Sequence, residues 1–157
     1  PNWDQYFISI AKETAKRSTC NRKNVGAVIT KDNRIIATGY NGSPKGAPHC
    51  DEAGHLLKVI DGRESCVRTV HAEVNALIQM RELGDTLYTT AFPCMECMKC
   101  IINAGIDKIY YDEYYGSRMT DASFNLALDA GIRVASRGIE LKFMEQGKII
   151  TKGLPKW

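Results

Sequence analysis

The sequence predicts a three-layer α/β/α fold in which a mixed sheet of five strands carries helices on both faces. Three observations lead to this prediction. The chain has 157 residues and is 44% hydrophobic, which is enough to bury a core without disulfides. Near the N-terminus, two apolar segments joined by turn residues are typical of an antiparallel hairpin. Later apolar segments alternate with helical patterns of about ten residues, which favours parallel strands joined by right-handed crossovers.

The N-terminal part predicts one helix, one hairpin and a long irregular segment. Residues 2–18 carry apolar side chains at helical spacing, so we expect one face of a helix to pack on the core. The segments 25–30 and 34–40 flank the turn KDNR and predict the hairpin. Residues 41–66 are rich in Gly, Pro, His, Cys and Asp, with a short helical piece expected around residues 55–60. A loop of this length is usually functional or held in place by a ligand.

The remaining core is predicted as a long helix followed by an alternating pattern. Residues 67–83 predict a helix that ends before Gly84. The next segments predict, in order, a strand over 86–92, a helix over 93–105, a strand over 107–113, a helix over 121–131 and a strand over 132–136. Nothing in the composition divides the chain, so we expect one domain over residues 1–157. Its core extends from about 5 to 136, and the tail 138–157 has no assigned element.

Composition and charge restrict the function. The net charge is +3 and the basic residues are scattered, so we expect no long nucleic-acid groove, whereas a small phosphorylated ligand fits. No run of about 18 apolar residues occurs, so we expect no membrane span. The N-terminus carries Asp4 and Glu13 and lacks the features of a secretory signal. We therefore expect a cytoplasmic protein, in which clustered cysteines more often bind metal than form disulfides.

Three cysteines lie at intervals of three residues in the segment FPCMECMKC. Pro93 is favoured in the first turn of a helix, which places Cys94 and Cys97 near free amide groups that stabilise thiolates. Cys94 and Cys100 are about 9 Å apart along a helix axis, but two sulfurs on one zinc lie within about 4.6 Å of each other. Cys97 with Cys100 is the alternative pair, deeper in the helix. We therefore expect Cys94 and Cys97 to bind a metal, and Cys100 to be a small buried hydrophobic residue.

The segment HAEV supplies a third ligand and an acid. His71 followed by Glu73 is a weak pattern by itself, and a capping or core histidine is the simpler interpretation. However, the strand over 86–92 leads from this helix into PCMEC, so the two helix starts can face each other. One histidine and two cysteines leave the fourth zinc position open, as a catalytic site requires. Zinc would then activate a water molecule, and Glu73 would move its protons.

The combination HAE followed by PCMEC matches the H-x-E and P-C-x-x-C pattern of zinc nucleobase deaminases. The segments STCNRKNVGAVI, ATGYNGSPKG and CVRTVHAEVNAL resemble the deoxycytidylate (dCMP) deaminase family, which includes bacterial and phage members. The resemblance implies a cytidine deaminase-like fold and a catalytic zinc held by His71, Cys94 and Cys97. It also implies Glu73 as proton shuttle in the hydrolysis of dCMP to dUMP and ammonia, which supplies dUMP for thymidylate synthesis.

The same resemblance implies substrate contacts. Asn41, in GYNG, would contact the nucleoside, although a turn residue before Gly42 is an equally simple interpretation. Arg22 and Lys23 would contact the phosphate, whereas isolated basic residues in a loop are more often only solvated. Tyr115 follows a parallel strand at its carboxyl end, where ligands tend to bind. It could pack on the base or reach the phosphate.

The other cysteines and histidines predict a second zinc. Cys50 and Cys66 bracket an irregular stretch that has too few apolar residues to order itself, and a metal would offset the entropy of ordering it. Several dCMP deaminases resemble this chain in carrying a further zinc there. The predicted ligands are Cys20, Cys50, His55 and Cys66, a closed structural set. His49 is the alternative ligand, and three reduced, buried thiols without metal are the other interpretation.

Family resemblance also implies partners. Members assemble into homo-oligomers, with the hexamer favoured here, and dCTP (with Mg²⁺) and dTTP regulate many of them. Gly42 and Lys45 are the positions expected to meet such an effector. Two alternatives stay open: another zinc deaminase, acting on cytidine or on adenosine in transfer RNA, and a non-catalytic zinc-binding module of the competence type. The modest charge disfavours the transfer RNA enzyme, and Glu73 disfavours the module.

Overall fold

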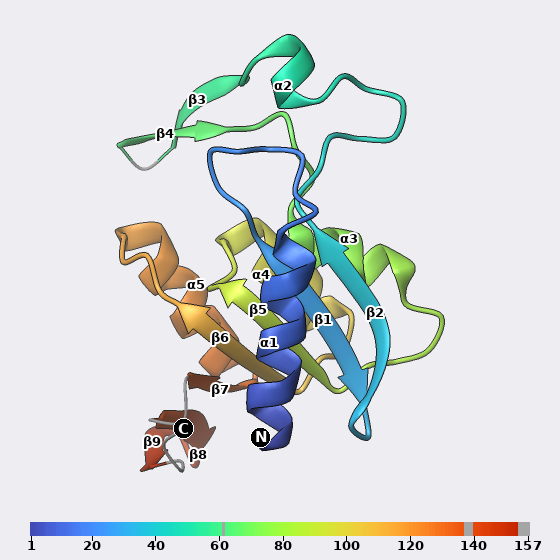
Figure 1. Ribbon diagram of the computed structural model, residues 1–157. Coiled ribbons are helices and arrows are strands. Elements are labelled where there is room, and N and C mark those ends of the chain that lie inside the picture. The colour runs from blue at the N-terminus through green and yellow to red at the C-terminus, as the bar shows by residue number, and fades with distance from the viewer. Residues whose placement is uncertain (61, 137–139, 154–157) are drawn as a thin grey trace.

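The computed structural model describes residues 1–60, 62–136 and 140–153. Its main sheet contains the strands β1 (Gly26–Lys31), β2 (Arg34–Tyr40), β5 (Thr86–Ala91), β6 (Lys108–Glu113), β7 (Arg133–Ser136), β8 (Glu140–Glu145) and β9 (Lys148–Gly153). A small second sheet contains β3 (Leu57–Ile60) and β4 (Arg63–Cys66). The helices are α1 (Trp3–Ala15), α2 (Cys50–Ala53), α3 (Ala72–Gln79), α4 (Met95–Asn103) and α5 (Arg118–Asp129). Figure 1 shows their arrangement.

The main sheet is mixed, as predicted. Its order is β2-β1-β5-β6-β7-β8-β9, with antiparallel pairs from β2 to β5 and parallel pairs from β5 to β7. The β1–β2 hairpin turns at Asp32 and Asn33, which both have positive φ, as the two-residue turn of a twisted hairpin requires. The sequence thus predicted the direction of the main-sheet strands β1, β2, β5, β6 and β7.

The prediction of five strands is wrong because the tail adds two more. β8 pairs antiparallel with β7, and β9 pairs antiparallel with β8. The β8–β9 turn lies at Gln146 and Gly147, whose φ values are 50° and 75°. Glutamine is an uncommon residue at a position with positive φ, so this turn lacked the usual asparagine or aspartate signal.

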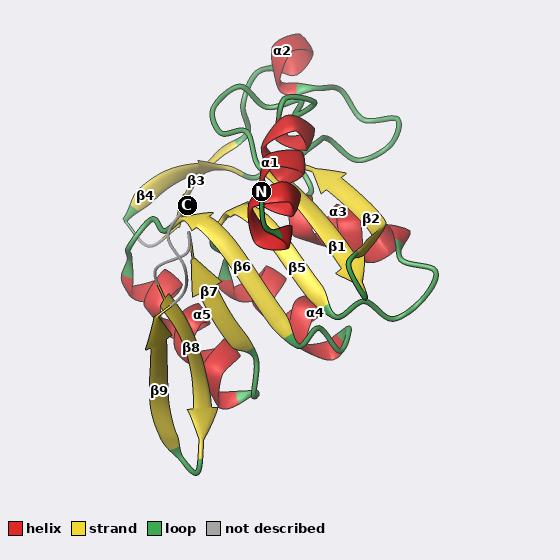
Figure 2. Ribbon diagram, turned by 60° about the horizontal axis from the view of Figure 1, so that its bottom comes forward, coloured by secondary structure: helices red, strands yellow, loops and turns green. Residues whose placement is uncertain are grey.

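Helices cover both faces of the sheet, which confirms the three-layer prediction. On one face α1 packs Phe7, Ile8 and Ala11 against Tyr88 and Tyr110 of the strands. On the other face, α3, α4 and α5 enclose the larger core, which includes Ala76, Met98, Ile101, Ala127 and Leu128. Figure 2 shows α1 on one side of the sheet and these three helices on the other. Among the described residues, no helix has both the length and the apolar composition to cross a lipid bilayer.

Two predicted elements need correction. The helical piece expected at residues 55–60 is wrong: Leu57–Ile60 is the strand β3, and the short helix α2 precedes it. Val59 and Ile60 are β-branched, and Gly62 (φ 73°) turns the chain back into β4. The helix expected at 67–83 is too long, because Val70 pairs with Gly42 in an extended bridge and α3 begins only after His71.

Candidate functional site

Two helix starts bring one histidine and two cysteines together. His71 precedes the first residue of α3, Cys94 precedes the first residue of α4, and Cys97 lies in the first turn of α4. The Nδ1 atom of His71 is 3.2 Å from the Sγ atom of Cys97 and 3.5 Å from that of Cys94. We call these three residues the inner cluster. Their ligand atoms all lie within 4.8 Å of one another.

Close packing of α3 on β2 fixes the position of His71. A Cβ atom on Gly39 would lie only 2.2 Å from the carbonyl oxygen of Ala72, so glycine alone allows this approach. The side chain of Asn75 donates a hydrogen bond of 2.8 Å to the carbonyl oxygen of Tyr40. The bridge between Gly42 and Val70 holds the chain immediately before the histidine. The backbone is therefore held on both sides of His71, by the bridge at Val70 before it and by the packing of α3 on β2 after it.

The inner cluster fits a zinc ion with one open position. Two thiols and one imidazole are a zinc donor set, and sulfurs that share one zinc lie within about 4.6 Å of each other. A hydrogen bond from Cys97 lowers the pKa of the Cys94 thiol to about 4, and His71 adds to the effect. The same bond and burial raise the pKa of Cys97. The two sulfurs thus share a proton that a metal ion would displace.

Glu73 lies beside the inner cluster and is nearly inaccessible, at 4% exposure. Its position in the first turn of α3 directs the carboxyl group toward β5, where Thr89 Oγ1 lies 3.2 Å from Glu73 Oε1. Burial raises the pKa of the Glu73 carboxyl group, and the positive charge of His71 opposes this only in part. A buried acid with a raised pKa next to metal ligands is suited to accept and release a proton.

Cys100 does not lie in the core, so the prediction of a buried residue is wrong. It is exposed on α4, whereas Cys97, Met98 and Ile101 face inward. At about 100° per residue, Cys100 lies about 200° from Met98, on the far side of the helix. The choice of Cys94 with Cys97 does not depend on this burial, and among the described residues Cys100 belongs to no group of potential metal ligands.

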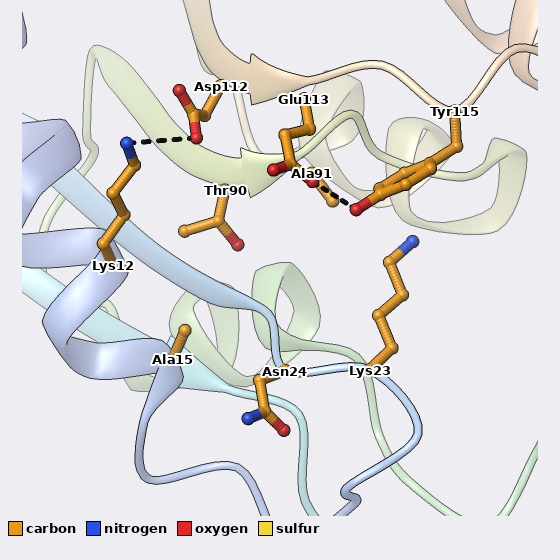
Figure 3. Close-up of a pocket in the computed structure, with 9 residues that line it drawn as sticks. All are labelled: Lys12, Ala15, Lys23, Asn24, Thr90, Ala91, Asp112, Glu113 and Tyr115. Atoms are coloured by element: carbon orange, nitrogen blue, oxygen red, sulfur yellow. Dashed lines mark hydrogen bonds and ion pairs between the residues drawn. The ribbon is translucent and has the colours of Figure 1, made fainter.

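A pocket of about 340 Å³ lies at the ends of β5 and β6, next to the end of α1 (Figure 3), and no residue of the inner cluster lines it. Lys23 extends into it, with Nζ 4.2 Å from the centre of the Tyr115 ring, and Tyr115 donates a hydrogen bond to Glu113. Burial lowers the pKa of Lys23, and the negative charges of Glu73, Cys94 and Glu113 oppose the shift. Lys23 therefore lies within electrostatic range of both the pocket and the inner cluster.

Arg22 and Asn41 have partners other than the pocket. The guanidinium group of Arg22 donates a hydrogen bond of 3.1 Å to the carbonyl oxygen of Glu64 in β4. The side chain of Asn41 is buried, accepts from the amide of Val25 at 2.8 Å and donates to the carbonyl oxygen of Lys23 at 2.7 Å. Asn41 thus shapes the loop that carries Lys23, and one N–H of its amide stays available for another partner.

A second group of ligand residues lies at the outer segment formed by α2, β3 and β4. It consists of Cys20, Cys50, His55 and Cys66, whose ligand atoms also lie within 4.8 Å of one another. We call it the outer cluster. The Sγ of Cys20 is 3.6 Å from Nδ1 of His55, and the Sγ atoms of Cys50 and Cys66 are 3.6 Å apart. His49 lies outside it, with its Nδ1 atom 3.9 Å from Glu52.

The outer cluster offers four donors, which suits a closed zinc site. Burial raises the pKa of the Cys50 thiol to about 12. Burial also opposes ionisation of Cys66, but hydrogen bonds, chiefly from the backbone of Arg68 and from His55, lower its pKa to about 6. As in the inner cluster, neighbouring sulfurs stabilise one another by sharing a proton, which a metal ion would replace.

The two predicted effector positions differ in environment. Gly42 is buried and pairs with Val70, next to His71. Lys45 is exposed on the loop that follows.

Sequence reasoning missed Thr89 and Arg63. Thr89 is fully buried on the core-facing side of β5, between Leu87 and Ala91. A polar residue at a core-facing position of an alternating strand was the signal that could have identified it. Arg63 donates a hydrogen bond of 3.1 Å to the carbonyl oxygen of Gly116, which ties the outer segment to the loop after β6. No sequence pattern near Arg63 or Gly116 predicts that contact.

Known proteins resemble this chain over most of its length. The family model described as "Cytidine and deoxycytidylate deaminase zinc-binding region" matches residues 1–113. ComE operon protein 2 of Bacillus subtilis is 46% identical over 119 residues, which cover 73% of this chain and 61% of that protein. This chain thus spans less than two thirds of the Bacillus protein. Deoxycytidylate deaminase of Mycobacterium phage D29 is 45% identical over 122 residues, which cover 71% of this chain and 94% of that protein.

Among solved structures, the dCMP deaminase of cyanophage S-TIM5 in complex with dCMP and dUMP superposes with a TM-score of 0.70 and 31% identity. The match covers 87% of this chain and 97% of the phage chain.

Proposed function

The chain belongs to the cytidine and deoxycytidylate deaminase family, and on that basis we propose that it hydrolyses dCMP to dUMP and ammonia. The observation that carries the proposal is the similarity along 94% of the length of a phage deoxycytidylate deaminase. The cyanophage relative, whose structure contains dCMP and dUMP, supports the same substrate and product. Family membership confirms the resemblance inferred from the segments HAE and PCMEC.

We assign a catalytic zinc to His71, Cys94 and Cys97, since the family is a zinc-binding one and the donor set fits. When bound there, zinc would supply Lewis-acid activation of a water molecule for attack on C4 of the cytosine ring. Glu73 would accept a proton from that water and deliver it to the ring nitrogen. The carboxylate would then take the remaining proton of the hydroxyl group added at C4 and pass it to the amino group, which leaves as ammonia while C4 becomes the carbonyl of dUMP. The raised pKa of the buried carboxyl group supports this role as proton carrier.

Nucleotide binding is assigned to the pocket at the ends of β5 and β6. Lys23 would contact the phosphate, Tyr115 would flank the nucleotide, and Asn41 would contact the nucleoside through its remaining N–H group. Arg22 lies next to Lys23 and is the second phosphate candidate. The proximity of Lys23 to both Tyr115 and Glu73 supports the assignment.

Replacing Lys23 with methionine is expected to raise KM for dCMP by about tenfold, because an ammonium–phosphate contact contributes roughly 1–2 kcal/mol. KM for deoxycytidine, which has no phosphate, should stay unchanged. Lys16→Met removes an exposed charge that forms an ion pair with Glu13 and serves as the control. Equal increases in KM for the two substrates would place the phosphate elsewhere, and Arg22→Met would then be the next variant to measure.

A structural zinc in the outer cluster is the second metal assignment. Metal analysis of the purified protein should find about two zinc ions per chain, and Cys50→Ala should reduce this to about one. The variant should also unfold at a lower temperature, because the outer segment loses its crosslink. Cys100→Ala, which alters an exposed thiol outside both clusters, is the matched control. One zinc per chain, unaffected by Cys50→Ala, would rule the second ion out.

Regulation and assembly complete the proposal. We assign the effector site, for dCTP with Mg²⁺ or for dTTP, to the loop at Gly42 and Lys45, and we propose a homo-oligomer, with the hexamer favoured. Gly42 is hydrogen-bonded to Val70, next to His71, and this contact supports the proposal that an effector bound at the loop would change the position of the inner cluster. Activity titrated with each nucleotide and the molar mass measured by light scattering test the two assignments.

The function itself is tested by incubating the purified protein with dCMP and measuring ammonia and dUMP. Deoxycytidine, cytidine and transfer RNA are the competing substrates, and a preference for any of them would replace the proposed reaction with that of a related deaminase. A protein that binds zinc yet releases no ammonia from any of these compounds would be a non-catalytic binding module.

A further inference from the structure

Thr89 on β5 is the side chain outside the inner cluster that contacts the Glu73 carboxyl group. Its Oγ1 atom lies 3.2 Å from Oε1 of Glu73 and 2.8 Å from the carbonyl oxygen of Ala91. Thr89 is 0% exposed, so no solvent competes for these contacts. Among the residues that the structure describes, Cys97 and the amide of Glu73 itself also hydrogen-bond with the carboxyl group. Since Cys97 is a proposed metal ligand, Thr89 is the side-chain partner that remains when its sulfur is engaged.

The Thr89 hydroxyl group lies between Glu73 and the backbone of β5. A hydroxyl group carries one hydrogen and two lone pairs, so it can donate to one neighbour while it accepts from another. Its two neighbours here are the carboxyl group of Glu73 and the carbonyl oxygen of Ala91, which only accepts. The contact therefore ties the Glu73 side chain to a fixed point of the strand.

We propose that Thr89 is a positioning residue, whose hydroxyl group holds the Glu73 side chain in one rotamer. The proposal rests on the proposed function, in which Glu73 carries the proton. β5 places Thr89 with Leu87 and Ala91 on the face that packs against α3 and α4. A valine would fill the same space at this position without offering a hydrogen bond. The hydroxyl is thus a polar group in an apolar layer, and its contacts with Ala91 and Glu73 are the ones that satisfy it there.

The test compares Thr89→Val, which removes the hydroxyl at nearly constant volume, with Thr89→Ser, which retains it. Thr89→Val should lower kcat for dCMP by about 10–100-fold, while KM and zinc content stay unchanged. Thr89→Ser should keep most of the activity. Thr30→Val is the matched control, because it alters a buried threonine near the far end of the same sheet. In a Glu73→Gln background, Thr89→Val should have no further effect, since the residue acts through Glu73.

A structural measurement separates this proposal from the proposed function. In crystals of Thr89→Val, the Glu73 carboxyl group should occupy more than one rotamer, and in the parent protein only one. If the parent releases no ammonia from dCMP, the proposed function fails, but the rotamer comparison still decides the role of Thr89. Parental kcat in Thr89→Val, or an unchanged Glu73 rotamer, would overturn the proposal.

Discussion

Glu73→Gln is expected to lower kcat for dCMP by about 10²–10⁴-fold, because general acid–base catalysis contributes a factor of this size. Glutamine has nearly the same shape, but it cannot accept and release a proton at neutral pH. The fold and the metal should both survive, since Glu73 supplies no donor to the inner cluster. Thermal unfolding and metal analysis check those two points on the same preparation that is used for kinetics.

The control for this variant is Glu96→Gln. Glu96 lies on α4, close to the inner cluster in sequence, but it is exposed and pairs with Lys99 at 2.9 Å. Its replacement should leave kcat and KM unchanged. Near-parental turnover by Glu73→Gln would contradict the mechanism. Among the described residues, no other carboxyl group is both buried and in contact with the inner cluster, so none could replace Glu73 as the proton carrier.

Cys97→Ser should remove the catalytic zinc and reduce activity by on the order of 10³-fold or more, since the activation of water by a metal would be lost. The Cys97 sulfur is buried and lies 3.2 Å from His71 Nδ1, so water cannot easily take its place. A serine hydroxyl stays protonated at neutral pH and is a poor zinc ligand. The zinc content per chain and the rate of ammonia release measure the two expected losses.

Cys100→Ser distinguishes the chosen pair of cysteines from the alternative. It follows Cys97 by one helical turn but is exposed and lies outside both clusters. It should therefore keep its zinc and its activity. A variant at Cys100 that lost the catalytic metal, together with a Cys97→Ser protein that kept it, would show that the wrong cysteines were assigned.

Local periodicity was sufficient to predict the sheet up to β7, because each strand and helix there carries its own apolar pattern. Helix rise and zinc–sulfur distance excluded the pair Cys94 and Cys100, and the position of Cys94 and Cys97 at the helix start favoured them over Cys97 with Cys100. The outer cluster was proposed because the stretch between Cys50 and Cys66 has too few apolar residues to order itself, and the family resemblance supported Cys20 as a further ligand.

The errors concern properties that depend on tertiary contacts. Residues 57–60 became a strand only by pairing with β4, and the start of α3 was delayed by the bridge between Gly42 and Val70. The partner of Arg22 in this structure, the carbonyl group of Glu64, is likewise more than 40 residues away in the sequence, and the role of Arg22 in phosphate binding stays a prediction. The exposure of Cys100 depended on which face of α4 met the sheet. Sequence spacing alone does not specify such contacts.

The outer segment is ordered in a different way from the sheet beneath it. All four residues of β3 are exposed, so burial of apolar surface contributes little to its order. It is held instead by the outer cluster and by the bonds from Arg22 to Glu64 and from Arg63 to Gly116, which are polar and directional. Its local opening free energy is therefore separate from that of the core. The outer segment can therefore open locally while the sheet stays folded, and the bond from Arg63 would carry that opening to the loop at Gly116, next to Tyr115 of the pocket.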